Sequence, residues 1–147
     1  MRVVLQRVTS ANVTVERTIV GQIGHGLLIF IGITHGDSAE DAQWLADKTA
    51  DLRIFEDDQD KMNRSLIDTG GSALVVSQFT LLADCRKGRR PAFTDAAEPK
   101  LANRLYEHYA ESLRARGIRV EQGTFAADMK VTLVNDGPVT MVIDRNA

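Results

Sequence analysis

The clearest candidates for chemistry are polar side chains that follow an apolar stretch of the chain. Residues 73–76 are apolar and typical of a strand, and they run directly into Ser77, Gln78, Phe79 and Thr80. A hydroxyl can attack an acyl carbon, whereas a buried strand disfavours polar groups that lack partners. An edge strand or a set of hydrogen-bonded core hydroxyls explains the same pattern equally well, so the segment is a candidate site with a structural alternative.

The side-chain sets of the familiar enzyme classes are absent from the sequence. His25, His35 and His108 are scattered, and the only cysteine is Cys85. A metal site needs several ligands at workable spacing, so neither a metal nor another cofactor is expected. His25 and His35 each adjoin a glycine and are interpreted as turn residues. The chain also lacks the Gly-x-Ser-x-Gly elbow and the Gly-rich phosphate loops.

One dense basic run stands out in an otherwise acidic chain. It contains Arg86, Lys87, Arg89 and Arg90, with Gly88 inside it and Pro91 directly after it. Glycine and proline at this spacing predict a mobile surface loop. Because the formal net charge is −2 and the pI is near 5.9, any nucleic-acid binding must be local. A solvated loop is the preferred interpretation, and a phosphate contact is the alternative.

A second local feature is the sequence Asn135-Asp136-Gly137-Pro138. An ordinary β-turn between two strands explains these residue types. Only a cis peptide bond would make the turn unusual, because about 5% of bonds before proline are cis.

Length and composition bound the elements that must position these residues. At 147 residues, with 44% hydrophobic and 26% charged residues, the chain predicts a single globular domain. The apolar run Leu27 to Ile33 is too short to span a bilayer, and the first residues lack the features of a signal peptide. A lone cysteine fits a reducing compartment, so a cytoplasmic location is expected.

The amino-terminal half predicts a sheet followed by a helix. Strands are predicted at Arg2–Val8, Asn12–Glu16, Thr18–Ile23 and Leu27–Thr34. The fourth is almost continuously apolar, so we expect it to be central. Ser38 and Asp41 resemble a capping box at the start of a helix from about Ala39 to Leu52. Phe55 to Gly71 is polar and predicts a surface connection with a short hairpin.

The carboxyl-terminal half predicts one more helix among four strands. Strands are predicted at Ala73–Leu82, Ile118–Phe125, Lys130–Asn135 and Val139–Asp144. The helix, about Pro99 to Arg116, carries an apolar stripe and is followed by Gly117. The expected fold is α+β: one domain with a mainly antiparallel, barrel-like core of about eight strands and two helices.

Short motifs occur in a fixed order along nearly the whole chain. They occupy residues 4–8, 12–16, 24–28, 61–63, 77–81, 125–129 and 135–140. Each motif is weak alone, but the ordered set resembles the D-aminoacyl-tRNA deacylase family, editing enzymes that free tRNA from D-amino acids. The resemblance implies a homodimer that acts on the charged acceptor end of tRNA in the cytoplasm.

The resemblance also implies a role for each candidate residue. Gly137 and Pro138, joined by a cis bond, reach from one subunit into the pocket of the other, and Arg7 holds them from behind through backbone carbonyls. The implied pocket has Ser77, Gln78, Phe79 and Thr80 at its floor. Phe125 and Met129 flank the terminal adenosine or the pocket wall.

Such a pocket selects chirality without reading the side chain. If backbone atoms fix the α-amino group and the carbonyl, a rigid wedge blocks the direction of an L side chain. Glycine has no side chain and passes this filter, so glycine mischarged on tRNA-Ala is expected as a second substrate.

The expected chemical step is hydrolysis of the ester to the terminal ribose. Backbone amides near Phe79 and Thr80 are expected to stabilise the oxyanion, with the RNA 2′-hydroxyl helping to activate water. Thr80 as a nucleophile is ranked second, because its segment contains no base.

Two rival functions remain open from the sequence. One is an ester hydrolase that acts on D-amino acid derivatives without tRNA and uses Thr80 as its nucleophile. The other is a non-catalytic RNA-binding module that uses the Arg86 to Arg90 run. Neither a membrane nor DNA is expected as a partner.

Overall fold

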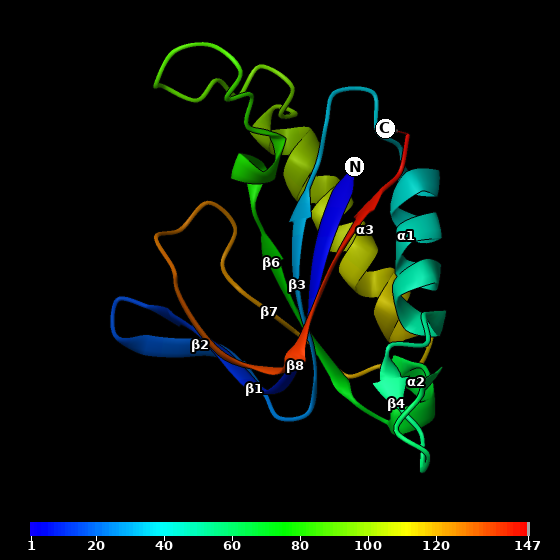
Figure 1. Cartoon of the computed structure of the whole chain (residues 1–147). Coiled ribbons are helices and arrows are strands. Elements are labelled where there is room, and N and C mark those ends of the chain that lie inside the picture. Colours follow the sequence, from blue (N-terminus) through cyan, green and yellow to red (C-terminus); the bar gives the residue numbers. More distant parts are fainter. Residues whose placement is uncertain (147) are drawn as a thin grey trace.

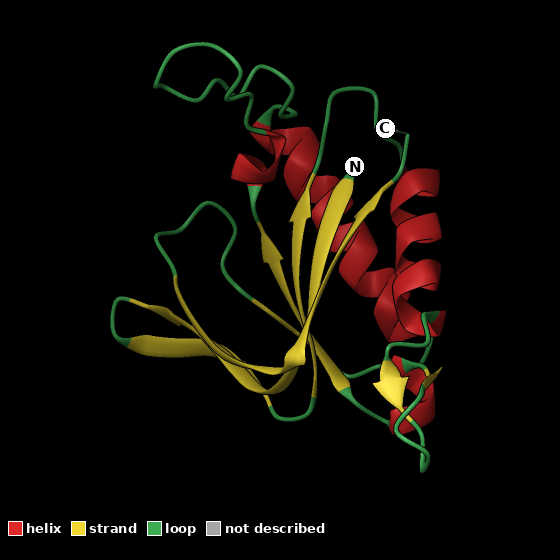
Figure 2. Ribbon diagram, viewed as in Figure 1, coloured by secondary structure: helices red, strands yellow, loops and turns green. Residues whose placement is uncertain are grey.

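The protein is built on a six-stranded sheet that curls toward a barrel, with its helices packed on one side (Figures 1 and 2). The computed structural model describes residues 1–146. The strand order is β2-β1-β3-β6-β7, and β8 pairs with β1. The strands are β1 Arg2–Val15, β2 Thr18–Ile23, β3 Gly26–Gly32, β4 Phe55–Glu56, β5 Met62–Arg64, β6 Ser72–Ser77, β7 Val120–Gln122 and β8 Lys130–Asp144. The helices are α1 Ala39–Asp51, α2 Leu66–Thr69, the 3-10 turn η1 Phe79–Leu82 and α3 Pro99–Ala115.

The central strands have two buried faces, which explains their continuous apolar sequence. Leu27 and Ile29 of β3 belong to a core that also contains residues of α1 and α3. Leu28 of the same strand belongs to a second core inside the curled sheet, together with Val8 and Val13. The prediction that this strand is central is confirmed by its place between β1 and β6.

Both long helices begin and end close to the predicted positions. At α1, the Ser38 side chain and the Asp41 side chain cap each other's backbone N–H groups, so the predicted capping box is present. At α3, the Glu98 carboxylate accepts from the N–H groups of Lys100 (3.0 Å) and Leu101 (2.8 Å). Buried hydroxyls of Thr49 and Tyr109, 2.7 Å apart, link the two helices.

Four predicted strands need correction, because they form two longer strands. The two strands predicted at Arg2–Val8 and Asn12–Glu16 form the single strand β1. The pairing of β1 with its neighbours is irregular around Val8, so the strand continues without a turn. The two strands predicted after residue 130 likewise form β8, which continues through an irregularity opposite β1.

The remaining differences concern short elements. The strand predicted at Ala73–Leu82 ends at Ser77, and η1 follows it. The strand predicted at Ile118–Phe125 is the shorter β7. The predicted hairpin is β4 with β5, but the helix α2 after it was missed. Most pairs are antiparallel as predicted, whereas β3 with β6 and β6 with β7 are parallel.

A close backbone contact brings the two ends of the curled sheet together. A methyl group added at Gly21 of β2 would lie 2.6 Å from the carbonyl oxygen of Gln122 in β7. A side chain at this position would push β2 away from β7. Glycine here therefore permits the nearly closed barrel.

Candidate active site

An apolar cavity of about 490 Å³ lies at the carboxyl end of β6. We call it the β6 cavity, and its lining residues are Val76, Ser77, Gln78, Phe79, Ala96, Ala97, Pro99, Ala102, Phe125, Ala126, Ala127, Asp128, Met129 and Val131. It is therefore bounded by η1, the start of α3 and the segment before β8. This size lies within the range of small-molecule binding sites. Five of the six residues predicted to form the pocket line this cavity, and Thr80 does not.

The floor of the β6 cavity is where β6 stops and η1 starts. The Gln78 N–H donates to the carbonyl of Ile31 (2.8 Å), which is the last sheet bond of this strand. The next two N–H groups, of Phe79 and Thr80, are at the start of a helical turn and have no partner within it. Among the described residues no other acceptor is bonded to them. Two backbone donors are thus free beside the cavity.

The hydroxyl of Thr80 is bonded to a neighbouring residue of the cavity floor. It accepts a hydrogen bond from the side-chain amide of Gln78. The hydroxyl has no histidine or carboxylate among its hydrogen-bond partners in the described part of the chain. An alcohol nucleophile needs such a base, so the geometry gives no support to Thr80 as the attacking group.

The opposite wall of the β6 cavity is held in place by a buried tyrosine. The Tyr106 hydroxyl donates to the carbonyl of Val75 (3.2 Å) and lies 3.4 Å from the carbonyl of Gly123. Its ring lies 6.0 Å from the ring of Phe125, centroid to centroid. Burial raises the pKa of Tyr106 to about 12, so the donor keeps its proton at neutral pH. From the sequence, Tyr106 was predicted only as part of the apolar stripe of this helix, and its role at the cavity was missed.

The β6 cavity contains little charge. Asp128 is the one ionisable residue of its lining, and its carboxylate is paired with Lys130 at 3.2 Å. The histidines lie elsewhere: the ring of His25 packs on Phe55, and His35 Nε2 lies 2.6 Å from the carbonyl of Thr94. The lining therefore offers hydrogen-bond donors and apolar walls rather than a side-chain acid–base pair. In residues 1–146, no three His, Cys, Asp or Glu side chains are placed to hold a metal ion.

Gly137 and Pro138 lie in an insertion of β8, and the peptide bond between them is cis. Gln6 of β1 is opposite Thr140, and Val8 is opposite Asn135. Residues 136–139, which we call the Gly-Pro segment, therefore face Arg7 alone. Both Gly137 and Pro138 are exposed at this insertion.

The buried Arg7 side chain supports the Gly-Pro segment from beneath. Its Nε donates to the carbonyl of Asp136 (3.1 Å), and its Nη1 donates to the carbonyl of Ile54 (2.9 Å). The carboxylates of Glu56 and Asp136 lie 3.5 and 3.6 Å from the guanidinium and balance its charge. The guanidinium thus ties the segment to the loop that precedes β4.

Asn135 closes the same insertion and ties it to β1. Its side-chain amide donates to the carbonyl of Arg7 (2.9 Å) and to the carbonyl of Val139 (3.0 Å). It thereby replaces ladder bonds that the insertion interrupts. From the sequence, Asn135 was predicted to be a turn residue, because the pattern Asn135-Asp136-Gly137-Pro138 is typical of a turn and does not show that the Asn side chain bridges a bulge within one strand.

Within one chain, the Gly-Pro segment and the β6 cavity lie apart. Arg7 is opposite Leu27, and Leu27 is opposite Ala73, whereas Ser77 lies four residues farther along β6. At about 3.3 Å per residue, this is roughly 13 Å along the sheet. The structure therefore brings Ser77, Phe125 and Met129 together but does not place Gly137 or Pro138 among them.

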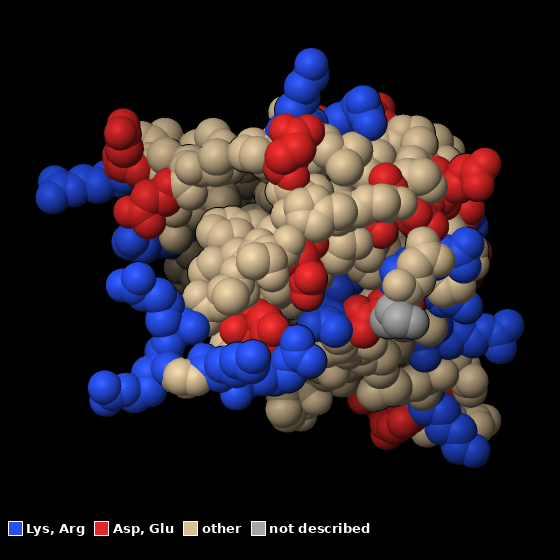
Figure 3. Space-filling model, turned by 90° about the horizontal axis from the view of Figure 1, so that it is seen from above, with Lys and Arg blue, Asp and Glu red and all other residues tan. Residues whose placement is uncertain are grey.

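The basic run is at the surface, as predicted. Its four cationic residues are all exposed, as is the free Cys85. Figure 3 looks down on this end of the molecule and shows Lys and Arg side chains gathered to one side, below a hollow in the surface.

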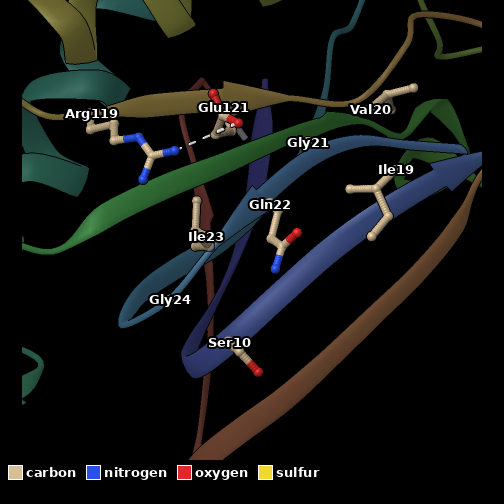
Figure 4. A pocket seen from close by; sticks show the side chains of 9 residues that line it. All are labelled: Ser10, Ile19, Val20, Gly21, Gln22, Ile23, Gly24, Arg119 and Glu121. Carbon is tan, nitrogen blue, oxygen red and sulfur yellow. Dashed lines mark ion pairs between the residues drawn. The ribbon is translucent and has the colours of Figure 1, made fainter.

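A separate hollow lies between β2 and β7 and contains none of the predicted site residues. Its volume is about 570 Å³. Arg119 and Glu121 form an ion pair of 3.9 Å at its edge, drawn as a dashed line in Figure 4. The hollow is the seam of the nearly closed barrel. Of the helices in residues 1–146, none is long and apolar enough to cross a membrane.

Comparison with known proteins gives one consistent result. A family model described as D-Tyr-tRNA(Tyr) deacylase matches residues 4–144. A D-aminoacyl-tRNA deacylase of Thermomicrobium roseum is 61% identical over 98% of this chain and 94% of its own. The corresponding protein of Exiguobacterium sibiricum is 59% identical over 99% of this chain and all of its own.

Two solved structures share the fold over nearly the full length. One, described as c-Myc DNA Unwinding Element Binding Protein, has a TM-score of 0.93 and 36% identity, covering all of both chains. The other, described as a probable eukaryotic D-amino acid tRNA deacylase, has a TM-score of 0.84 and 22% identity over 98% of each chain.

Proposed function

The chain belongs to the D-Tyr-tRNA(Tyr) deacylase family and is a D-aminoacyl-tRNA deacylase, and on that premise we propose that its β6 cavity holds the aminoacylated end of tRNA. Ser77, Gln78 and Phe79 form the floor under the ester, and Phe125 and Met129 flank the terminal adenosine. The apolar walls and the free backbone donors of η1 support this placement. The cytoplasm, where tRNA is charged, is the proposed compartment.

The chirality filter is the Gly-Pro segment of a second copy of the chain. The observation that carries this proposal is the separation within one subunit: Gly137 and Pro138 are exposed and do not line their own cavity. In a homodimer, each segment enters the partner's cavity and blocks the direction of an L side chain. Glycine, which has no side chain to exclude, passes, so glycine mischarged on tRNA-Ala is also cleaved.

The chemical step is assisted by the substrate. Water attacks the ester carbonyl, and the free N–H groups of Phe79 and Thr80 stabilise the oxyanion. The bond from the carbonyl carbon to the ribose 3′-oxygen then breaks, and that oxygen takes the proton that water gave up, relayed by the neighbouring 2′-hydroxyl. The products are a free D-amino acid and a free 3′-hydroxyl. The nearly uncharged cavity supports this route, because its lining contains no histidine or cysteine.

The alternative is a Thr80 nucleophile acting on D-amino acid esters. The bond from Gln78 to Thr80 and the absence of a neighbouring base among the described residues argue against it. A terminal 2′-deoxyadenosine separates the two: substrate assistance predicts strongly reduced cleavage, whereas a Thr80 nucleophile predicts normal cleavage that Thr80→Ala abolishes.

The filter is tested by Gly137→Ala, with hydrolysis of matched D- and L-aminoacyl-tRNA as the measurement. At φ +128, an added methyl group would lie 2.9 Å from Val139 Cγ2 and 3.0 Å from Arg7 Nη2. The segment must therefore shift, and the ratio of D to L cleavage should fall by about tenfold or more. Gly117→Ala is a matched control, because Gly117 also has positive φ but faces open space. An unchanged ratio in Gly137→Ala would contradict the filter.

A mixing experiment tests the contribution of the second copy. A subunit with an altered Gly-Pro segment is combined with a subunit whose cavity is filled by Ala126→Trp. If each site uses two copies, the intact cavity of the first subunit receives the intact Gly-Pro segment of the second. The mixed dimer then contains one native site and hydrolyses the D ester selectively. No recovery in mixed dimers isolated by two affinity tags would show that each cavity uses its own segment.

A further inference from the structure

An aromatic pair, with Phe79 exposed and Phe93 half-buried, lies on the rim of the β6 cavity. Phe79 is 56% exposed, and its ring meets that of Phe93 edge to face, with centroids 5.1 Å apart. Phe79 lines the cavity, so the pair lies directly at its mouth. An aromatic side chain this exposed beside a site is more characteristic of binding than of core packing.

The basic loop, residues 84–92, is fastened next to this pair. Asp84 and Ala92 exchange two backbone hydrogen bonds of 2.7 and 2.9 Å that close the base of the loop. Arg86 donates to the Asp84 carboxylate through Nε and Nη2. This pairing lowers the pKa of Asp84 to about 2, so the ion pair persists at any physiological pH.

The other three cations of the basic loop have a different environment from that of Arg86. Lys87, Arg89 and Arg90 are exposed. Within residues 1–146, the ion pairs of this loop involve Arg86 and no other loop cation. One arginine is thus used to shape the loop, and three cations remain available to an anionic partner.

The segment after the loop connects it to the cavity. Phe93 follows the closing residue Ala92, and Ala96 and Ala97 line the β6 cavity. The Ala97 N–H donates to the carbonyl of Ile33 (2.9 Å), which attaches this segment to the chain after β3. The chain therefore leads from the cations of the basic loop to the aromatic pair and then to the β6 cavity. We call this stretch, together with Phe79, the rim.

We propose that this rim is a platform for the single-stranded nucleotides that precede the terminal adenosine. A base stacks on Phe79 and Phe93, and Lys87, Arg89 and Arg90 bind the phosphates. Aromatic side chains combined with nearby cations are the usual means of holding a single strand without reading its sequence. The net charge of −2 makes such a local patch necessary for attraction to RNA. The platform rests on the proposed function, because the terminal adenosine must occupy the β6 cavity.

The test compares two esters that differ only in the preceding nucleotides. One is 3′-D-tyrosyl-adenosine, and the other is the same ester on the trinucleotide CCA. In the double variant Arg89→Gln/Arg90→Gln and in Phe93→Leu, KM for the trinucleotide ester should rise about tenfold, within the range expected for stacking and phosphate binding. The effect on the adenosine ester should be much smaller, and kcat for both esters should change little.

Salt dependence and a matched control sharpen the result. The slope of log KM against log salt for the trinucleotide ester should fall by about 0.7 for each phosphate that the variant no longer neutralises. The control is Arg53→Gln/Arg119→Gln, which removes the same charge from exposed positions elsewhere. It should leave both the slope and KM near their native values. Thermal unfolding of each variant identifies any loss of folded protein.

Three results would overturn the platform. If KM rose equally for both esters, the rim would act by shaping the cavity. If KM stayed native for both esters, the nucleotides would not touch the rim. Equal losses of salt slope in the control would mean that net charge alone attracts RNA. If the native protein released no amino acid from either ester, the proposed occupancy of the cavity would fail, and the platform with it.

Discussion

The two ends of the sheet differ in how their backbone polar groups are used. At the Gly-Pro segment, the carbonyls of Arg7, Asp136 and Val139 all accept bonds from buried or half-buried side chains. At the β6 cavity, the N–H groups of Phe79 and Thr80 are unpaired among the described residues. One end is fixed by its own side chains, and the other keeps donors for a ligand.

This difference fits two distinct physical tasks. A surface that excludes by shape must be rigid, since a clash that can relax does not discriminate. A surface that stabilises developing charge needs donors in place beforehand and free of competing partners. Substitutions can weaken each end separately. The expected effect is largest for Arg7 and smallest for Asp128.

The largest effect is expected for Arg7→Met. Loss of the guanidinium leaves the carbonyls of Asp136 and Ile54 without their donor, so the free energy of unfolding should fall by about 3 kcal/mol. The ratio of D to L hydrolysis should fall as well, because the Gly-Pro segment loses its support. Urea unfolding and paired hydrolysis assays measure the two effects. Arg116→Met is the control, because Arg116 makes partly exposed ion pairs with Asp47 and Asp51, far from both ends; it should cost under about 1 kcal/mol and leave the ratio intact.

Asn135→Asp should have the next largest effect. The carboxylate has nearly the shape of the amide but cannot donate to the carbonyls of Arg7 and Val139, so we expect a loss of about 2 kcal/mol. The ratio of D-ester to L-ester hydrolysis should fall by a larger factor than the rate of D-ester hydrolysis itself. A fall in both rates by the same factor would mean that Asn135 stabilises the fold without positioning the segment.

Tyr106→Phe tests whether the Tyr106 hydroxyl positions the frame of the β6 cavity. Tyr109→Phe is its matched control. Both tyrosines are buried on α3 and hydrogen-bonded, but only the Tyr106 hydroxyl contacts the frame of the cavity. Each change should cost about 1 to 2 kcal/mol. A rise in KM for D-aminoacyl-tRNA is expected for Tyr106→Phe alone; an equal rise in both variants would contradict the positioning role of Tyr106.

The stabilising contribution of Tyr106 also has a predictable pH dependence. Burial raises its pKa from 10.0 to about 12 in the folded protein. The contribution is therefore complete below about pH 10 and is lost as the pH rises toward 12. The difference in unfolding free energy between the native protein and Tyr106→Phe should be constant up to pH 10 and then shrink. A difference that already shrinks between pH 7 and 9 would contradict this assignment.

The smallest effect is expected for Asp128→Asn. Its carboxylate is exposed and, among residues 1–146, is paired with Lys130 alone, so stability should change by less than about 0.5 kcal/mol. If substrate assistance operates, kcat should change by less than about threefold, since a general base contributes about a hundredfold or more. A much larger loss would identify Asp128 as a base and remove the need for the 2′-hydroxyl.

Local pattern was enough to predict most of the fold. The capping box at Ser38 and the apolar stripe of α3 are short-range signals, and both helices were found to within a residue or two. The breaks in β1 and β8 were predicted wrongly, because turn-like residues such as Ser10 and Gly137 occur at bulges as well as at turns. The end of β6 was missed because Phe79 and Leu81 continue its apolar pattern.

The candidate site was less accessible to sequence reasoning. The resemblance directed attention to Ser77 and Phe125, and the fold brings both to one cavity. Tyr106 and Asn135 act through hydrogen bonds to carbonyls that are distant in sequence or lie across a bulge. Such bonds depend on tertiary geometry, which neither composition nor spacing encodes.

The insertion in β8 also constrains how this gene can vary. After residues 136–139, Met141 and Ile143 point inward, whereas Val142 is 60% exposed. Removing or adding one residue in the insertion would exchange these faces for the rest of the strand. Selection should therefore act more strongly against single-residue insertions and deletions here than against replacements. The length of this stretch should be more strongly conserved than its sequence.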